Sequence, residues 1–223
     1  MLYIVSTPIG NLEDITLRAL RILGEVDLIL CEDTRIAKKL LNHYEIKTSV
    51  QSYHQHSSLQ KIDYIIDLLQ QGKNLALISD AGTPAVSDPG SMLVGKIRAE
   101  LPEEKIVAVP GASALTATIA LAGIPIQDFI FLGFLPHKKG RETLFQEISK
   151  SERAMIFYES THRIIKTLQS LSTKTPDRKI ILAREITKIY EETLIGTASE
   201  LLQILASKPE KTRGEFVVIV TRK

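Results

Sequence analysis

The chain has 223 residues, of which 44% are hydrophobic and 24% are charged, a composition typical of a globular protein with one large domain or two small ones. A single cysteine, Cys31, excludes an internal disulfide, and no apolar run approaches the roughly 20 residues that a membrane-spanning helix needs. The sequence begins directly with a strand pattern and shows no basic leader, so we expect a cytoplasmic protein that does not associate with a membrane.

Charge is unevenly distributed along the chain. Residues 1–135 hold 11 Lys and Arg against 15 Asp and Glu, whereas residues 136–223 hold 17 against 11. A basic half beside an acidic half fits a polyanionic partner, and a scatter of solvated surface charges explains the same distribution.

Strands and helices alternate through the first half of the sequence. Short apolar runs predict strands at residues 2–7, 26–31, 49–53, 75–78 and 105–109. The segments between them predict helices that begin at Asp14, Thr34 and Ser58, and further helices at 91–97 and 114–121. This order predicts an α/β fold with a largely parallel sheet and helices on both of its faces.

The pattern changes near residue 123, where Ile124-Pro125 interrupts it. We therefore expect a first α/β domain over residues 1–123 and a second over residues 124–223. The second half predicts strands at 129–134, 154–158, 179–183, 190–195 and 215–221, with helices at 142–149 and 162–171. Thr197 and Glu200 predict the capping box of a last helix.

The most informative segment is the loop at residues 79–90, Ser-Asp-Ala-Gly-Thr-Pro-Ala-Val-Ser-Asp-Pro-Gly. It follows a predicted buried strand, its small residues and prolines let a ligand approach the backbone, and Asp80 and Asp88 lie near its ends. Loops at the carboxyl ends of strands in an open α/β sheet are where ligands bind. An ordinary turn would use the same residue types, and the length of the loop favours a site.

Other loops that follow predicted strands are also rich in polar residues. Glu32 and Asp33 follow the second strand, where an acidic side chain often holds a ribose hydroxyl, and a helix cap at Thr34 with acids beside it explains them equally well. His54 and His56 have a spacing that suits a metal, but no third ligand lies at short range and we expect no metal site. The remaining loops of this kind cover residues 7–14, 110–113, 157–163 and 183–188.

Taken together, these segments resemble the small-subunit ribosomal RNA cytidine 2′-O-methyltransferases of the tetrapyrrole methylase superfamily. The resemblance extends over nearly the whole chain, and its specificity comes from the order of ten motifs, each of which is weak alone. The motifs are Thr7-Pro8-Ile9-Gly10-Asn11-Leu12, Glu32-Asp33-Thr34-Arg35, Ser52-Tyr53-His54, Ser79-Asp80-Ala81-Gly82-Thr83-Pro84, Ser87-Asp88-Pro89-Gly90, Pro110-Gly111-Ala112-Ser113-Ala114, Gly133-Phe134-Leu135-Pro136, Tyr158-Glu159-Ser160, His162-Arg163 and Arg184-Glu185-Ile186-Thr187-Lys188.

The resemblance implies two α/β domains of the tetrapyrrole methylase type, with the cofactor S-adenosylmethionine in the cleft between them, and a homodimer. It implies an enzyme that methylates the 2′-hydroxyl of a cytidine in 16S ribosomal RNA of the small ribosomal subunit, in the decoding region. The residues that it implies as cofactor contacts are Pro8, Gly82, Thr83, Pro84, Val86, Ser113, Ala114, Tyr158 and Ala183.

Methyl transfer to a ribose hydroxyl needs a nearby group that accepts or orients the hydroxyl proton. The resemblance moves the acidic residues after the second strand from the cofactor to the RNA side of the cleft. The catalytic candidates are Glu32, Asp33 and Asp88. The candidates for contacts with RNA, mostly cations that would bind phosphate, are Arg35, His54, Lys138, Lys139, Arg141 and Arg163.

Two features depart from the family pattern. Thr161 replaces the proline of the common Glu-Ser-Pro-His-Arg, and we expect this change only to relax a turn. Many members continue past the last strand into a small helical domain, whereas this chain ends at Lys223.

Two other interpretations are open from the sequence. One is a methyltransferase that acts on a small tetrapyrrole or precorrin, which the Glu-Asp-Thr-Arg and Tyr-Glu-Ser segments disfavour. The other is a non-catalytic RNA-binding module that kept the fold, because a fold alone does not fix a function.

Overall fold

The computed structural model describes residues 1–54, 57, 59–88 and 90–223. Contacts within the chain divide it into two compact units, Met1–Ser113 and Ala114–Lys223, and each unit has a sheet of its own. None of the helices in the described part is long and apolar enough to cross a membrane.

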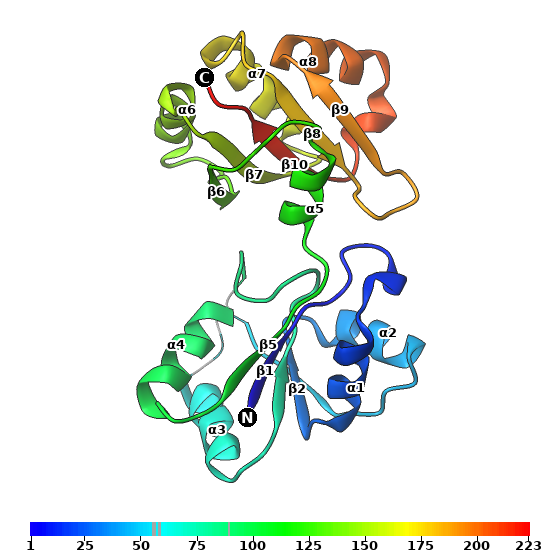
Figure 1. Ribbon diagram of the computed structural model, residues 1–223, viewed down its shortest axis with the longest axis vertical. Helices are drawn as coiled ribbons and strands as arrows, with labels where there is room; N and C mark the ends of the chain where they lie inside the picture. The colour runs from blue at the N-terminus through cyan, green and yellow to red at the C-terminus, as the bar shows by residue number, and fades with distance from the viewer. Residues whose placement is uncertain (55–56, 58, 89) are drawn as a thin grey trace. The chain divides into compact units, whose positions relative to one another are not determined.

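The first unit is built around a five-stranded sheet in which all neighbouring strands are parallel (Figure 1). The strand order is β3-β2-β4-β1-β5. The strands are β1 (Leu2–Val5), β2 (Leu28–Cys31), β3 (Val50–Ser52), β4 (Leu75–Leu77) and β5 (Ile106–Val109). The parallel sheet predicted from the alternation of elements is therefore confirmed for this unit.

Helices cover both faces of this sheet, as the sequence predicts. Successive strand residues point to opposite faces, so Ile29 and Cys31 pack against one helix pair while Leu30 packs against the other. The first pair is α1 (Leu17–Glu25) and α2 (Thr34–His43), the second is α3 (Leu59–Gln70) and α4 (Gly90–Glu100), and a short 3-10 helix, η1 (Leu12–Asp14), precedes α1. Since helices bury both faces, the strands are apolar on both sides, as is usual in parallel sheets.

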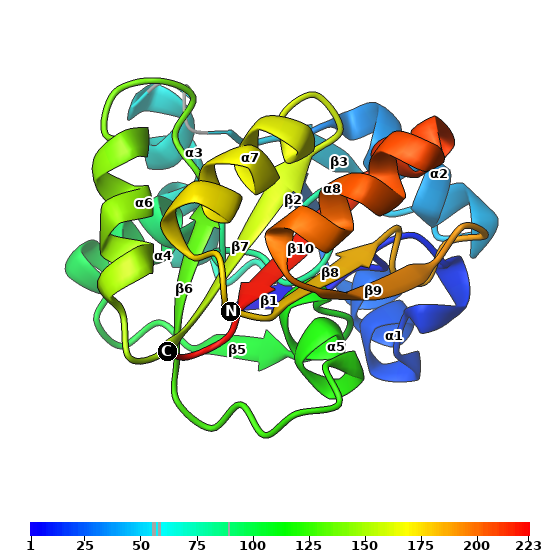
Figure 2. The same ribbon diagram turned by 90° about the horizontal axis from the view of Figure 1, so that it is seen from above.

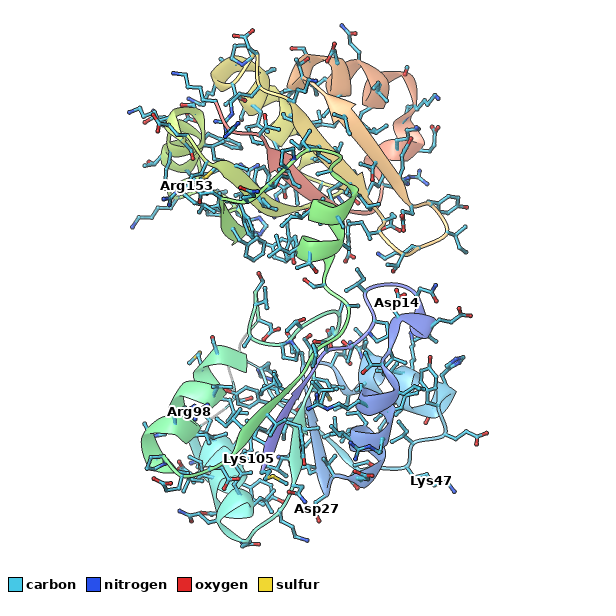
Figure 3. The ribbon with its side chains drawn as sticks, in the orientation of Figure 1. Asp14, Asp27, Lys47, Arg98, Lys105 and Arg153 are labelled. Atoms are coloured by element: carbon cyan, nitrogen blue, oxygen red, sulfur yellow. The ribbon has the colours of Figure 1, made fainter. Side chains whose placement is uncertain are left out.

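The two ends of this sheet are marked by labelled residues in Figure 3. Asp27 and Lys105 come just before β2 and β5, and they lie at the amino ends of the strands. Asp14, which follows β1, lies at the opposite end of the unit. The loops that leave β1, β2, β4 and β5 therefore start at the Asp14 end, where ligands bind in sheets of this kind.

The second unit contains a mixed five-stranded sheet with the order β6-β7-β10-β8-β9. Strands β6 and β7 are parallel, and the other neighbouring pairs are antiparallel. The strands are β6 (Phe129–Phe134), β7 (Ala154–Ser160), β8 (Ile180–Arg184), β9 (Glu192–Gly196) and β10 (Glu215–Val220).

One face of the second sheet carries the core of this unit. Phe157 and Val218 from the strands pack there against Phe145, Leu168 and Leu201 from three helices. These helices are α6 (Arg141–Lys150), α7 (Ile164–Lys174) and α8 (Ala198–Ser207), and a 3-10 helix, η2 (Pro209–Thr212), follows α8. The view from above in Figure 2 shows α6, α7 and α8 arranged side by side over the strands.

Helix α5 (Ala114–Leu121) belongs to the second unit, where it contacts β10. Figure 1 shows it on the side of the sheet opposite α7 and α8. This packing explains why the chain divides between Ser113 and Ala114, whereas the sequence pattern changes only near residue 123. The connection Ala112–Ser113 thus leads from the candidate loops of the first unit directly into α5.

Two helix caps differ from the predicted ones. Thr16 caps α1 in place of Asp14, because its hydroxyl accepts a hydrogen bond from Ala19 N at 3.1 Å. Asp33 caps α2 in place of Thr34 by accepting from Arg35 N at 2.8 Å. Asp and Thr are both favoured helix caps, so a sequence that offers both close together does not decide between them.

Two other predicted helix starts have different outcomes. The capping box of Thr197 and Glu200 is present at the start of α8, as predicted. The predicted start of α3 at Ser58 lies outside the described residues.

Candidate functional site

The loops after β1 and β4 are joined by a pair of backbone hydrogen bonds. Thr7 N donates to the Gly82 carbonyl at 2.9 Å, and Gly82 N donates to the Thr7 carbonyl at 3.1 Å. The buried Thr7 hydroxyl also donates to the carbonyl of Ser79 at 3.1 Å. The two loops therefore form one ordered surface at the carboxyl ends of neighbouring strands.

The loop after β5 approaches the same surface. Ser6 Oγ lies 2.9 Å from Thr83 Oγ1, and the Thr83 hydroxyl donates to the Ala112 carbonyl at 3.4 Å. Gly111 packs so closely on Ser6 that an added Cβ would lie 2.9 Å from Ser6 Cβ. The structure thus brings together the three loops of the first unit that carry predicted cofactor contacts, at Pro8, Gly82–Val86 and Ser113.

Asp88 forms the turn at the end of the 79–90 loop. Its Oδ1 accepts hydrogen bonds from Ala85 N at 2.7 Å and from Gly90 N at 2.9 Å. Ala85 has a φ of 69°, a left-handed conformation that a non-glycine residue seldom adopts without such support. The Asp88 carboxylate therefore holds the loop and the start of α4 in place. Val86, which lies between Ala85 and Asp88 in the sequence, is exposed.

Asp33 is also engaged by its neighbours. Besides capping α2, its carboxylate forms an ion pair with Arg35. The side-chain and backbone hydrogen bonds from Arg35 lower the pKa of Asp33 to about 2. A carboxylate with so low a pKa is a weak proton acceptor. The guanidinium of Arg35 is exposed, but it already has an anionic partner in Asp33.

Glu32 differs from the other two catalytic candidates. Burial raises its pKa above the ordinary value, and the nearby negative charges of Asp88 and Asp80 raise it further, while a hydrogen bond from the backbone of Asp80 opposes them. A carboxylate whose charged form is destabilised in this way accepts a proton more readily than an unperturbed one. Among the three candidates, Glu32 is the one whose surroundings suit a general base.

His54 lies at the end of the segment after β3. Its backbone N–H donates to Ser57 Oγ at 3.0 Å, and the residue is exposed beside the buried ring of Tyr53. His56 lies outside the described residues, so the predicted His-x-His pair is described only in part. Within the described ranges, no group of three His, Cys, Asp or Glu side chains is placed to hold a metal.

The second unit gathers its three cofactor candidates on one face of its sheet. Tyr158 of β7 and Ala183 of β8 both pair with Val217 of the intervening β10, so they lie in one row on the same face. Burial raises the pKa of Tyr158, and a hydrogen bond with the backbone of Leu115, the residue after Ala114, opposes this effect. The register and this bond bring Ala114, Tyr158 and Ala183 together.

Two aromatic rings flank Tyr158 on the neighbouring strand. Phe131 and Phe134 of β6 meet its ring edge-on, with ring centroids 5.0 and 5.3 Å away. Phe134 is 56% exposed, which is unusual for a phenylalanine on a strand. This side of the sheet therefore presents an apolar aromatic surface next to the Tyr158 hydroxyl.

The four basic candidates of the second unit fall into two pairs. Arg141 and Arg163 are mostly buried, and both form ion pairs with the fully buried carboxylate of Glu159. Lys138 and Lys139 are exposed in the loop before α6. Of these four predicted phosphate-binding residues, the two arginines are therefore mostly buried and the two lysines are exposed.

Comparison with known proteins decides the family. Residues 1–202 match the family model of the Tetrapyrrole (Corrin/Porphyrin) Methylases. The chain belongs to this family. It is 47% identical over 225 residues to Ribosomal RNA small subunit methyltransferase I of Pasteurella multocida, with 100% of this chain and 79% of that protein covered. It is 46% identical over 222 residues to the protein of the same name from Thermotoga maritima, with 100% and 98% covered.

Solved structures of more distant enzymes share the fold. The methyltransferase CobJ matches with a TM-score of 0.70 and 21% identity over 99% of this chain and 93% of its own. A diphthine synthase matches with a TM-score of 0.73 and 16% identity over 99% and 89%. At these identities the likeness shows the architecture of two α/β domains and nothing about the substrate.

The residues of this member of the family fit S-adenosylmethionine, the methyl donor that its family membership and relatives imply. The cofactor carries a positive sulfonium, and Glu32, Asp80 and Asp88 place three carboxylates near one another. Gly82, with a φ of 80°, and the exposed Val86 let a ligand approach the loop backbone.

The sequence did not indicate the role of several residues on which this arrangement depends. Asp80 was noted at the end of its loop but was not assigned a role, although it bonds the Asp33 backbone at 3.1 Å. Ser6 and Thr7 are buried polar residues that end an apolar strand, and such residues are a usable signal for an ordered loop. Glu159 belongs to one of the ten motifs and precedes Arg163 by four residues, but the sequence did not indicate that its carboxylate is buried between Arg141 and Arg163.

Proposed function

We propose that this protein transfers a methyl group from S-adenosylmethionine to the 2′-hydroxyl of a cytidine in small-subunit ribosomal RNA. The observation that carries the proposal is the match at 46–47% identity, over the full chain, to proteins named Ribosomal RNA small subunit methyltransferase I. The Thermotoga relative is covered over 98% of its length, so the likeness includes nearly the whole of that protein.

The chemistry requires that an acceptor oxygen be held in line with a methyl carbon and that its proton be removed. When bound, S-adenosylmethionine supplies an electrophilic methyl carbon. In our proposal Glu32 would accept the proton of the ribose hydroxyl as the hydroxyl oxygen forms its bond to that carbon, while the bond from the methyl carbon to sulfur breaks and S-adenosylhomocysteine leaves. The raised pKa of Glu32, which burial and the charges of Asp88 and Asp80 produce, supports this assignment.

The other two catalytic candidates take supporting roles in this proposal. Asp33 holds the start of α2 and pairs with Arg35, and Asp88 holds the turn around Ala85. Both act by keeping the loops in place. Arg35 is oriented by Asp33, and its exposed guanidinium is available to an RNA phosphate on its outer side.

The cofactor contacts belong to the same proposal. Three loops of the first unit supply Pro8, Gly82, Thr83, Pro84, Val86 and Ser113. The second unit supplies Ala114 at the start of α5, and Tyr158 and Ala183 on one face of its sheet. This assignment is supported by the contacts described above, which bring the candidate residues of each unit close to one another within that unit.

A methylation assay tests the proposal. Purified protein, labelled S-adenosylmethionine and small ribosomal subunits from cells that lack this protein should give one 2′-O-methylated cytidine, located by mapping the modified ribose. Glu32→Gln should reduce kcat by about 100-fold or more while binding of S-adenosylhomocysteine, measured by calorimetry, is retained. Asp33→Asn is the matched control, and we expect its effect to be smaller.

The same assay separates the proposal from its competitors. Methylation of a porphyrinogen in place of ribosomal subunits would establish the small-molecule interpretation. Binding of RNA without any heat of binding for S-adenosylhomocysteine would establish a non-catalytic module. Either result would exclude the proposed reaction.

We also infer a homodimer that works in the cytoplasm. The family resemblance supports the dimer, and the lone buried Cys31 fits a reducing compartment. Sedimentation equilibrium should give twice the chain mass of 24.8 kDa, and a mass equal to one chain would exclude the dimer.

A further inference from the structure

The loop at residues 136–141, called here the basic loop, connects β6 to α6 and carries two exposed lysines. Among the described residues, the side chains of Lys138 and Lys139 have neither an ion-pair nor a hydrogen-bond partner. The acidic side chain next in sequence, Glu142, is paired with Lys174 of α7. The positive charge of the basic loop is therefore not neutralised by the part of the chain that the structure describes.

A buried carboxylate lies beneath this loop. The side chain of Glu159 is 0% exposed, and its Oε1 is 2.7 Å from Arg163 Nε and accepts from Ser160 N at 2.9 Å. Its Oε2 is 3.2 Å from Arg141 Nη2 and accepts from Thr167 Oγ1 at 2.7 Å. Both oxygens of Glu159 are thus fully used, and both arginines have an anionic partner inside the protein.

The two arginines hold the backbone at the start of the basic loop and at Leu135, the residue before it. Arg141 Nη1 donates to the Pro136 carbonyl at 3.1 Å, and Arg163 Nη1 donates to the Leu135 carbonyl at 2.7 Å. Arg141 Nη2 also donates to Thr167 Oγ1 at 2.6 Å, which joins the arginine to helix α7. We name Arg141, Glu159, Arg163 and Thr167 the Glu159 cluster; its bonds fix the start of the basic loop to β7 and α7.

The rigidity of this support has a consequence for binding. A lysine on a mobile loop loses conformational entropy when it binds a phosphate, whereas a lysine on a loop already held in place loses less. The second unit also carries the excess of basic residues seen in the sequence after residue 135. Exposed, unpaired cations on a held loop within a basic unit are the features expected of a surface that binds a phosphate backbone.

We propose that Lys138 and Lys139 bind backbone phosphates of the RNA substrate, and that the Glu159 cluster positions their loop without touching the RNA. This inference rests on the proposed function and makes it more specific. It assigns Arg141 and Arg163 to positioning, although the sequence grouped all four cations as substrate contacts. It also predicts that binding through this surface is sensitive to salt and indifferent to base identity.

The first test compares two double variants of equal charge change. Lys138→Gln/Lys139→Gln removes the proposed contacts, and Lys150→Gln/Lys208→Gln removes two exposed lysines of the same unit, one of them at the opposite end of α6. Binding to small ribosomal subunits from cells that lack this protein is measured between about 0.05 and 0.3 M salt, the range in which phosphate contacts are most visible.

We expect the Lys138/Lys139 variant to bind about tenfold more weakly than the wild type near 0.1 M salt. The plot of log K against log salt, which has a negative slope, should become less steep by about 2. KM for the subunits should rise, while kcat and calorimetric binding of S-adenosylhomocysteine should stay at the wild-type values. The control variant should keep the wild-type slope. If the wild type is active and the Lys138/Lys139 variant behaves like the control, this inference alone is overturned. If the wild type neither binds nor methylates the subunits, the proposed function is overturned and this inference with it.

The second test addresses the positioning role. Thr167→Val keeps the volume of a fully buried side chain but removes the hydroxyl that joins Arg141 to Glu159, and Thr167→Ser restores that hydroxyl. In the valine variant we expect amide hydrogen exchange of the basic loop to become about tenfold faster, KM for the small subunits to rise and kcat to stay unchanged. In the serine variant we expect both the exchange rate and KM to return to the wild-type values. Wild-type exchange and KM in the valine variant would exclude the positioning role.

Discussion

The backbone N–H of Asp33 donates a hydrogen bond to Asp80 Oδ1 at 3.1 Å, and this bond ties the loop after β2 to the loop after β4. Strands β2 and β4 are neighbours in the sheet, so the two loops start side by side. The bond keeps the carboxylate of Asp80 close to Glu32, where its charge adds to burial and to Asp88 in raising the pKa of Glu32. One residue thus acts as a tie between loops and as an electrostatic neighbour of the proposed base.

Asp80→Asn separates these two roles. Asparagine keeps an oxygen that accepts from Asp33 N, but it removes the negative charge, so the pKa of Glu32 should fall. Because Glu32 must be deprotonated to act as a base, a lower pKa moves the acid limb of the profile of kcat/KM against pH to lower pH. The measurement is that profile, recorded for both proteins with small ribosomal subunits as substrate.

Asp80→Ala provides the comparison for this prediction. It removes the charge and the hydrogen-bond acceptor together, so we expect the same direction of shift with an added loss of kcat from a displaced loop. An acid limb that stays in place in both variants would show that Glu32 is not the group whose ionisation controls the rate.

The order of elements was predictable because each signal is local. The apolar runs that became β1 to β10 and the capping box at Thr197 depend on neighbours within a few residues. The topology of the second sheet was not predictable in the same way. Strand β10 lies between β7 and β8, and this insertion depends on which apolar faces meet, as with Val217 between Tyr158 and Ala183.

The candidate loops were predictable from residue type, but the role of each side chain was not. Asp33, Asp88 and Glu32 are all carboxylates after a strand, and only the structure distinguishes a helix cap paired with Arg35, a turn anchor and a half-buried acid. The reason is that a role depends on partners distant in sequence. The bond from Asp33 N to Asp80 spans 47 residues, and no pattern in one sequence signals it.

Cys31 should react slowly with thiol reagents in the native protein. Burial, followed by the charges of Asp80, Asp33 and Glu32, raises the pKa of Cys31 from 9.0 to about 11. Since only the thiolate reacts, the reactive fraction at pH 8 falls by about 100-fold from this shift alone. The rate of reaction with a chromogenic disulfide should therefore be at least about 100-fold lower in the native protein than in urea.

The reaction rate of Cys31 also tests the electrostatic effect of Asp80, by comparison of the Asp80→Asn variant with the wild type. Removing one of the charges that disfavour the thiolate should make Cys31 react faster than in the wild type, with no enzyme assay involved. Equal rates in the native and unfolded wild type would contradict the burial of the thiol in the structure.

Gly111→Ala should destabilise the first unit by about 1–3 kcal/mol, the usual cost of overpacking a close contact. The added Cβ would lie 2.9 Å from Ser6 Cβ, and Ser6 also contacts Thr83. Gly95→Ala in α4 is the matched control, because an added Cβ there meets nothing within 4 Å and alanine is a better helix former. Urea denaturation should show the control to be more stable by about 0.5–1 kcal/mol, and an unchanged midpoint for Gly111→Ala would contradict the close packing of these loops.

Thr161→Val should destabilise the second unit by about 1–3 kcal/mol. The Thr161 hydroxyl donates to the Gly214 carbonyl at 2.7 Å and accepts from Gly214 N at 2.8 Å. These two bonds join the turn after β7 to the turn before β10, where Gly214 has a φ of 110° that other residues rarely adopt. Thr173→Val on α7, which loses one exposed hydrogen bond, is the control and should change stability by less than about 0.5 kcal/mol. Urea unfolding of the two variants checks the prediction, and equal midpoints would mean that the Thr161 hydroxyl contributes no more than a solvent-exposed one.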